Sequence, residues 1–370
     1  MNEAYITFIV TQACQLRCKY CYLIGKNDEG RMSLDVAMKA IDVILNEPSI
    51  TSKSYVTFDF IGGEPLLEMD LISDITDYLI QKMLNLQMYS WLDSYRINIT
   101  TNGLLYKNVK VQEYIAKHKD HLNISISIDG NKTKNDRNRV YANGKGSYDE
   151  LLPNVKLWVS QWPSVNTRMT ISHEDLPYVN ESLQHLISCG IRNIDVNPVL
   201  EDVWKEGDDV VFEDQLKKFA DYLVGSPRIE NLIITCFDGS IGHPLKNSKK
   251  VNPCGADMLT IDASGNFYTC LRFASFSLRD KPARIIGNYK TGININLLRP
   301  YLVVSPDVMA NGEKCCDCDI ASGCKYCPAE NYDASDNATI FERSTNICKM
   351  HRAKVNAKNY YFSLLEKVYK

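Results

Sequence analysis

The residues with the most specific chemistry are three cysteines near the N-terminus. Cys14, Cys18 and Cys21 are spaced CxxxCxxC within TQACQLRCKYCYL, directly after AYITFIV, an apolar run that predicts a strand. Thiolates are the usual ligands of iron-sulfur clusters, and a cubane contains four irons. Three thiolates therefore leave one iron without a protein ligand, and a small molecule can bind there and receive an electron.

Disulfides are the alternative use of these cysteines. The chain has thirteen cysteines, an odd number, and its N-terminus lacks the features of a signal peptide. A chain of 370 residues can bury a full core without disulfides, and cysteine clusters in intracellular enzymes more often bind metal or catalyse. No apolar run reaches the roughly 18 residues of a membrane span, and a formal net charge of -3 with mixed signs predicts no nucleic-acid partner. We therefore expect a cytoplasmic metalloenzyme that binds neither membrane nor nucleic acid.

The first 200 or so residues alternate β-rich runs with amphipathic windows, which predicts βα units on a parallel sheet. A complete barrel of eight units needs about 250 residues, so six units predict an α/β fold with an open, partial (β/α)6 barrel. Loops at the carboxyl ends of barrel strands carry the chemistry, and the cysteine triplet follows the first strand. The expected strands are 5–10, 55–61, 95–100, 122–128, 166–172 and 194–199, and the expected helices are 33–46, 71–83, 110–117, 148–159, 179–189 and 212–224.

The composition changes after this region. From Cys254 to Cys348 the chain has eight cysteines, few periodic runs and turn-forming clusters such as DASGN. Such a segment has too little apolar periodicity for a core of its own, and metal coordination is the usual remedy. We expect a barrel over residues 1–225, a metal-organised second domain over 226–350 and a closing helix over 351–370.

A second motif follows the second predicted strand. Gly62, Gly63, Glu64 and Pro65 form GGEP, in which two glycines permit close backbone approach to a ligand and the Glu64 carboxylate can meet an ammonium group. Taken alone, GGEP is also compatible with a tight turn before a helix. The cysteine triplet in the same chain favours the ligand-binding interpretation over the plain turn.

Together, CxxxCxxC after the first strand and GGEP after the second resemble the radical S-adenosylmethionine (SAM) superfamily. The resemblance implies a 4Fe-4S cluster on the triplet, with SAM chelating the unique iron and the GGEP stretch contacting its ammonium group. It implies reductive cleavage of SAM to a 5'-deoxyadenosyl radical. The cofactor carries out this reaction, and the protein binds and orients it.

Further matches to the family lie at the ends of later strands. Thr101 and Asn102 close the third strand, and Ser127 and Asp129 belong to an SxDG stretch whose serine contacts ribose in the family. Asp136 and Arg139, followed by Gly146 and Ser147, resemble the DxxR…GS segment of its peptide-modifying branch. The resemblance places Tyr20 against adenine, where plain packing is the alternative, and the strand period points Arg168 and Asn197 toward the same site.

The cysteines of the second region resemble the SPASM domain of this superfamily. The family carries two auxiliary 4Fe-4S clusters there, which with the SAM-binding cluster makes three. A Gly265 turn between LTI and FYT predicts a hairpin that brings Cys254 and Cys270 together. By motif position the outer cluster takes Cys315, Cys318, Cys324 and Cys348, and the inner one takes Cys254, Cys270 and Cys327.

Two departures from the SPASM pattern leave alternatives open. Cys324 and Cys327 are separated by two residues where the family usually has three, which puts the role of Cys327 in doubt. The inner cluster has no evident fourth ligand; Cys236, Cys316 and a substrate thiolate are the candidates. Structural zinc held by CxxC pairs is the competing interpretation of the whole region.

The resemblance implies a maturase that removes hydrogen from a ribosomally made precursor peptide, and we expect thioether crosslinks as the product. CKYCPAENY, residues 324–332, resembles a maturase group whose precursors carry cysteine repeats. Leu271 stands where the sulfatase-maturing branch has an acidic base, which disfavours that activity. The alternatives are carbon-carbon crosslinking, epimerisation and electron transfer without SAM cleavage. Expected partners are a reductant such as flavodoxin or ferredoxin and a separate leader-recognition protein, because the first strand begins too early for a preceding recognition domain.

Overall fold

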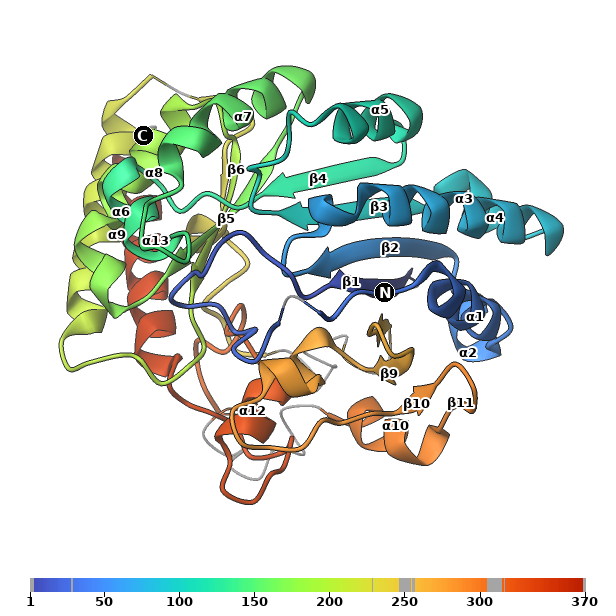
Figure 1. The fold of residues 1–370 in the computed structure, drawn as a ribbon. Helices are drawn as coiled ribbons and strands as arrows, with labels where there is room; N and C mark the ends of the chain where they lie inside the picture. The colour runs from blue at the N-terminus through green and yellow to red at the C-terminus, as the bar shows by residue number, and fades with distance from the viewer. Residues whose placement is uncertain are drawn as a thin grey trace.

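Six parallel strands, each followed by helix, build the larger part of the protein (Figure 1). The computed structural model describes residues 3–27, 29–227, 229–245, 254, 257–304, 315 and 317–368. The partial barrel predicted from sequence is confirmed, with strand boundaries shifted by two residues at most. The strands are β1 (Glu3–Thr11), β2 (Tyr55–Gly62), β3 (Arg96–Thr101), β4 (Leu122–Ile126), β5 (Asn166–Ile171) and β6 (Asn193–Pro198).

The helices lie on the outside of these strands (Figure 1). Helix α1 begins where its sequence predicts, because the Ser33 hydroxyl caps it by accepting a hydrogen bond from the Val36 amide at 3.3 Å. Its buried face includes Ala37, Ile41 and Ile44, at helical spacing. The barrel helices are α1 (Leu34–Leu45), α2 (Pro48–Thr51), α3 (Met69–Asn85), α4 (Tyr89–Ser94), α5 (Val109–His118), α6 (Lys132–Asn138), α7 (Tyr148–Gln161), α8 (Val179–Ser188) and α9 (Asp208–Gly225).

The strands present an apolar face to the helices and a polar face to the barrel interior. Phe8 and Phe60 stack with ring centroids 5.6 Å apart, and Phe58 packs edge-on against Trp91 of α4. Because side chains alternate along a strand, Thr7 and Asp59 point the other way, into the barrel. The inner face of these strands therefore carries polar and charged side chains in place of an apolar core.

A seam divides the barrel sheet between β4 and β5. β1 to β4 belong to one hydrogen-bonded sheet and β5 to β7 (Ile233–Ile234) to another. Thr167 bridges the seam: its buried hydroxyl donates to the Ile126 carbonyl at 2.7 Å and accepts from the Ile128 amide at 3.3 Å. Side-chain bonds here replace part of a backbone ladder.

The second region joins the barrel sheet directly. β8 (Met258–Ile261) runs parallel to β1 and antiparallel to β9 (Asn266–Tyr268), and Gly265 takes the turn with φ of +74°. The predicted hairpin is therefore confirmed, and the sheet continues across the expected domain boundary at residue 225. The remaining elements are β10 (Gly287–Asn288), β11 (Gly292–Ile293), α10 (Ile295–Leu302), α12 (Pro328–Ala334) and α13 (Cys348–Val368).

The closing helix α13 packs against α9 of the barrel (Figure 1). Asn356 donates to Glu213 at 2.8 Å, and the Tyr360 hydroxyl donates to Asp221 at 2.7 Å. The helix begins at Cys348, three residues earlier than expected, so a predicted cluster ligand is its first residue. Within the described chain, no helix combines the length and apolar character needed to cross a bilayer.

The seam gives a stability prediction. We expect Thr167→Val to lower the free energy of unfolding by about 1–3 kcal/mol, because the Ile128 amide would be left buried without its acceptor. Urea unfolding measures this, with Thr291→Val at an exposed turn as the matched control. Equal unfolding curves for the two variants would contradict the bridging role of Thr167.

Candidate iron-sulfur and cofactor site

The three cysteines of the triplet converge in the loop after β1. The charges of Cys14 and Cys21 act on Cys18, and the Cys21 amide donates to the Cys18 carbonyl at 3.1 Å. Burial raises the pKa of Cys18 to about 11, partly offset by the nearby Arg139 guanidinium. Without metal the Cys18 thiol holds its proton at neutral pH, so binding iron there must release that proton.

The GGEP stretch packs against the cysteine loop. The Gly63 amide donates to the Thr11 carbonyl and the Glu64 amide to the Ala13 carbonyl, both at 2.8 Å. A Cβ on Gly63 would lie 2.2 Å from the Ala13 oxygen, and one on Gly62, whose φ is +144°, would lie 2.0 Å from the Thr11 oxygen. The sequence explained these glycines by approach to a ligand, but the close approach in the structure is to the backbone that carries the cysteines.

The Glu64 carboxylate is fully buried and bonded within the protein. It accepts from the Thr101 hydroxyl at 2.6 Å, the Asn102 amide at 2.7 Å and the Leu66 amide at 3.0 Å. Burial raises its pKa, against these hydrogen bonds, which lower it. The Glu64 carboxylate, from which the sequence predicts an ammonium contact, ties the ends of β2 and β3 together.

Asn102 carries this connection to the triplet. Its amide nitrogen lies 3.8 Å from the Cys14 sulfur and donates to Gln15 at 3.1 Å. The predicted residues Glu64, Thr101 and Asn102 are thus brought together beside Cys14. Ser127 lies nearby, with its amide bonded to the Thr101 carbonyl at 2.9 Å.

A buried triad closes the other side of the triplet loop. The Tyr20 hydroxyl donates to Asp129, and Arg139 donates to the Tyr20 oxygen at 2.9 Å. Asp129 also accepts from the Thr170 amide of β5 at 3.1 Å. The Arg139 Nε is buried and has no hydrogen-bond partner among the described residues, so this donor remains for a ligand. The sequence had marked Arg139 through DxxR, without assigning it a site role.

Charged side chains line the inner face lower in the barrel. Arg168 pairs with Asp195 at 3.1 Å, and Lys325 donates to Asn197 from the second region. Burial would raise the pKa of Asp195, but the charges of Lys325 and Arg168 lower it overall. Asn197 and Arg168 therefore do point inward, as the strand period predicts.

The inner-cluster cysteines lie together. Cys254 and Cys270 share a hydrogen bond that raises the pKa of Cys254 and lowers that of Cys270, and the charge of Cys327 acts on Cys254. The Glu330 amide donates to the Cys327 sulfur at 3.5 Å. Cys327 thus joins the inner group despite its unusual spacing.

The outer-cluster cysteines form a second group. The charge of Cys348 acts on Cys324, and the charges of Cys315 and Cys318 act on Cys348. Arg343 donates to the Cys324 sulfur at 3.0 Å, a cation placed to offset thiolate charge. The partition of seven cysteines into groups of three and four agrees with the sequence pattern.

The fourth inner ligand is not among the described groups. Cys236 is fully buried, and the charges that act on it are those of Lys354 and Asp195. Cys316 lies outside the described residues. Within the described ranges, no three Cys, His, Asp or Glu side chains converge tightly enough for one metal ion.

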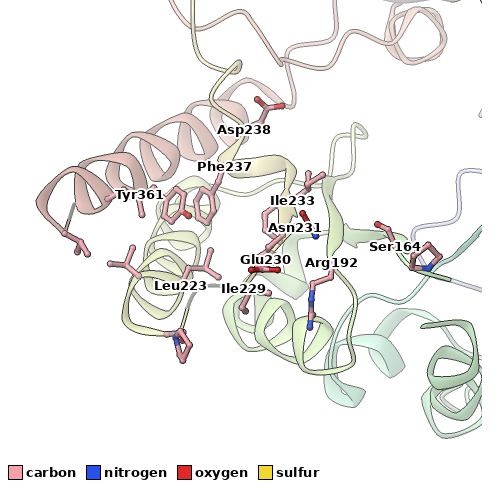
Figure 2. A pocket seen from close by; sticks show the side chains of 18 residues that line it. Ser164, Arg192, Leu223, Ile229, Glu230, Asn231, Ile233, Phe237, Asp238 and Tyr361 are labelled. Atoms are coloured by element: carbon pink, nitrogen blue, oxygen red, sulfur yellow. The ribbon is translucent and has the colours of Figure 1, made fainter. Parts of the chain in front are cut away.

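A large cavity of about 1460 Å³ lies elsewhere, between α9, β7 and α13 (Figure 2). Phe237 and Tyr361 stack on its wall with centroids 4.6 Å apart, and Arg192 and Glu230 reach its rim. None of its lining residues is a cysteine or belongs to the GGEP stretch. This hollow is separate from the site described above.

Comparison with known proteins identifies a family that matches the N-terminal half of this chain. Residues 8–186 match the family model described as the Radical SAM superfamily. They contain the end of β1, all of β2 to β5, the triplet, GGEP and the Tyr20–Asp129–Arg139 triad. Residues 8–186, just under half of the chain, therefore form a radical SAM domain.

Three curated proteins are similar to this chain in sequence. MJ0907 of Methanocaldococcus jannaschii is 34% identical over 50% of this chain and 59% of its own length. The subtilosin biosynthesis protein AlbA of Bacillus subtilis is 23% identical over 74% of this chain and 56% of its own. The cysteine-type anaerobic sulfatase-maturating enzyme of Clostridium novyi is 22% identical over 89% of both chains. The chain thus spans little more than half the length of the first two.

Solved structures share the fold over nearly the whole chain. anSMEcpe with bound AdoMet gives a TM-score of 0.69 at 17% identity, covering 99% of this chain and 98% of that one. SuiB of Streptococcus suis bound to its precursor peptide SuiA gives 0.62 at 16% identity, covering 94% and 76%. The fold is a mixed α/β partial barrel that resembles those of anSMEcpe and SuiB, followed by a C-terminal cysteine-rich region.

The glycine contacts predict a local effect on iron binding. We expect Gly63→Ala to lower iron content by about a third after reconstitution, the share of one cluster in three, because its Cβ would push the cysteine loop away. The control is Gly225→Ala, whose Cβ would have no heavy atom within 4 Å. Full iron loading in Gly63→Ala would show that the loop tolerates the displacement.

Asp59 predicts a pH effect on stability. Burial raises its pKa to about 7, against the Thr7 hydrogen bond and the Arg168 charge, which lower it. The folded protein therefore retains a proton that the unfolded chain releases, so stability is lost as pH rises from about 4 through 7. We expect Asp59→Asn to remove this loss and to stabilise the protein by about 2 kcal/mol more at pH 8 than at pH 5.

Anaerobic urea unfolding at the two pH values measures the difference. Asp214→Asn, whose side chain is 53% exposed on α9, is the matched control. An equal effect of Asp59→Asn at both pH values would mean that its carboxyl is ionised throughout this range.

Proposed function

We propose that this protein is a radical SAM peptide maturase that generates a 5'-deoxyadenosyl radical and removes hydrogen from a ribosomally made precursor peptide. The observation that carries the proposal is the convergence of three thiols, an unpartnered buried Arg139 Nε and the inner-face charges at one end of the barrel. Cys14, Cys18 and Cys21 would hold a 4Fe-4S cluster, and the cofactor supplies the radical chemistry. A precursor-peptide partner is supported by the fold shared with peptide-bound SuiB.

The chain's own residues position the cofactor. Gly62, Gly63 and Glu64 hold the cysteine loop at a fixed distance from β2, and Thr101 and Asn102 extend that support from β3. Arg139 offers a guanidinium nitrogen of the kind that binds a carboxylate, and the exposed edge beside Ser127 offers a hydroxyl for ribose. We assign Tyr20 and Asp129 the task of orienting Arg139, in addition to the adenine contact expected of Tyr20.

The second region supports a cluster-dependent reaction. The groups Cys254, Cys270, Cys327 and Cys315, Cys318, Cys324, Cys348 would each hold an auxiliary 4Fe-4S cluster. An inner cluster with three protein thiolates leaves an iron that a substrate thiolate can occupy. We propose thioether formation on this basis: carbon loses a hydrogen atom, the substrate thiol a proton, and one electron passes to a cluster.

Sulfatase maturation is the second candidate, favoured by the Clostridium novyi relative that aligns over 89% of both chains. Against it, Leu271 is a buried apolar residue where that branch places an acidic base. The neighbouring Arg272 is bound to Glu201 and Glu330, so the nearest carboxylates are occupied. Carbon-carbon crosslinking and epimerisation would use the same residues, and product analysis separates them from thioether formation.

Anaerobic reconstitution followed by reduction tests the proposal. We expect about twelve irons per chain, from three cubanes, and release of 5'-deoxyadenosine from SAM. Replacing Cys14, Cys18 and Cys21 by alanine should abolish that release while leaving about two thirds of the iron. Cys189→Ala, which changes a cysteine outside all three groups, is the control. Full iron loading without release of 5'-deoxyadenosine would contradict the proposed enzymatic activity and would favour an electron-transfer protein.

A further inference from the structure

Two cationic side chains from distant parts of the chain, Arg168 and Lys325, lie near each other on the inner face of the barrel. Arg168 stands on β5, and Lys325 comes from the loop between Cys324 and Cys327 of the second region. Both charges act on Asp195 of β6. Residues about 150 positions apart in sequence are thus brought to one point inside the barrel.

Arg168 keeps most of its hydrogen-bonding capacity. Its Nε donates to Asp195 at 3.1 Å, while no described residue accepts from its two terminal nitrogens. Its side chain is 64% exposed although Met169, the next residue, is fully buried on the opposite face. The guanidinium therefore presents a free planar edge to the interior, the geometry that binds a carboxylate through two parallel hydrogen bonds.

Lys325 has a similar surplus. Among the described residues its ammonium group donates to the Asn197 side chain alone, and an ammonium group carries three donors. Asp195 accepts from the Arg168 Nε on one oxygen and from the Thr235 hydroxyl on the other, the latter at 3.2 Å, and among the described residues it accepts no hydrogen bond from Lys325. For the remaining donors, the described residues provide no acceptor.

The charged groups around Arg168 and Lys325 do not neutralise the positive charge of these two side chains. Asp59 faces Arg168 from β2 but lies beyond ion-pair distance in the structure, and Lys354 of α13 adds a further cation beside Asp195. The Arg168 charge also acts on Tyr22, the residue that follows Cys21. The cationic group therefore lies close to the loop that would generate the radical.

We propose that Arg168 and Lys325 form a binding site for a carboxylate of the peptide substrate, an acidic side chain or the C-terminus, held next to the residue that loses hydrogen. The inference rests on the proposed function, because the substrate class comes from it. It reassigns Arg168 from the SAM contact expected from sequence to substrate recognition. Asp195 and Asn197 are positioning residues that fix the two cations.

Two pairs of small peptides test the site on the cluster-loaded protein with SAM present. In one pair, N-acetyl-Cys-Glu-amide and N-acetyl-Cys-Gln-amide differ in side-chain charge; in the other, N-acetyl-Cys-Ala acid and its amide differ in the terminal carboxylate. We expect the acid of at least one pair to bind about tenfold more tightly by anaerobic calorimetry. The pair that shows the preference identifies the source of the carboxylate.

The same preference should fall to about twofold or less in Arg168→Gln and in Lys325→Gln, since each loses a charge-assisted hydrogen bond. Lys325→Arg, which keeps the charge, should retain part of it. Lys39→Gln on the exposed face of α1 is the control, and iron content with the thermal midpoint confirms that each variant folds.

Three results would overturn the site. They are equal or unmeasurable binding of acid and amide in both pairs, a preference that survives both glutamine variants, and a tenfold loss of SAM affinity in Arg168→Gln with the peptide preference intact. Deoxyadenosine release by the same wild-type preparation separates the two proposals. Release without a carboxylate preference removes the inference alone, and a preference without release removes the proposed function alone.

Discussion

The contact between the GGEP stretch and the cysteine loop is the constraint on which the site depends. Two amide-to-carbonyl hydrogen bonds, from Gly63 and Glu64, extend the pairing of β1 and β2 beyond the barrel edge. No side chain fits between the two backbones, which explains both glycines. The buried Glu64 carboxylate then binds β3 through Thr101 and Asn102, so three consecutive strand ends move as one unit. The position of Cys14 follows from this unit.

Much of this architecture could be predicted from sequence because it is local. Alternating and helical periods predicted six strands and seven helices, and the resemblance to the SPASM pattern divided seven cysteines of the second region into two groups. The role of Glu64 could not be predicted, because a carboxylate after two glycines suits a ligand as well as a strand end 38 residues away. Spacing also gave no sign that Lys325 would enter the barrel, since that depends on how the second region docks.

Asp59 illustrates an intermediate case. The strand period that placed Phe58 and Phe60 toward the helices also placed Asp59 inside the barrel, so the alternation contained the signal. What the sequence lacked was its environment: a single hydroxyl from Thr7 and a distant Arg168 charge. A buried carboxyl with so little support holds its proton near neutrality, whereas Asp195, with a guanidinium and a hydroxyl as partners, does not.

The pairing of β8 with β1 has a consequence for synthesis of the chain. β1 leaves the ribosome well before β8, the strand that covers its second edge, because β8 lies more than 240 residues later in the chain. Until residue 258 emerges, the nascent barrel displays an unpaired strand beside three reduced thiols. An exposed edge of this kind is a site for aggregation, and accessible thiols are open to oxidation. Delivery of iron during translation, or a chaperone on that edge, would therefore protect the nascent chain from both hazards.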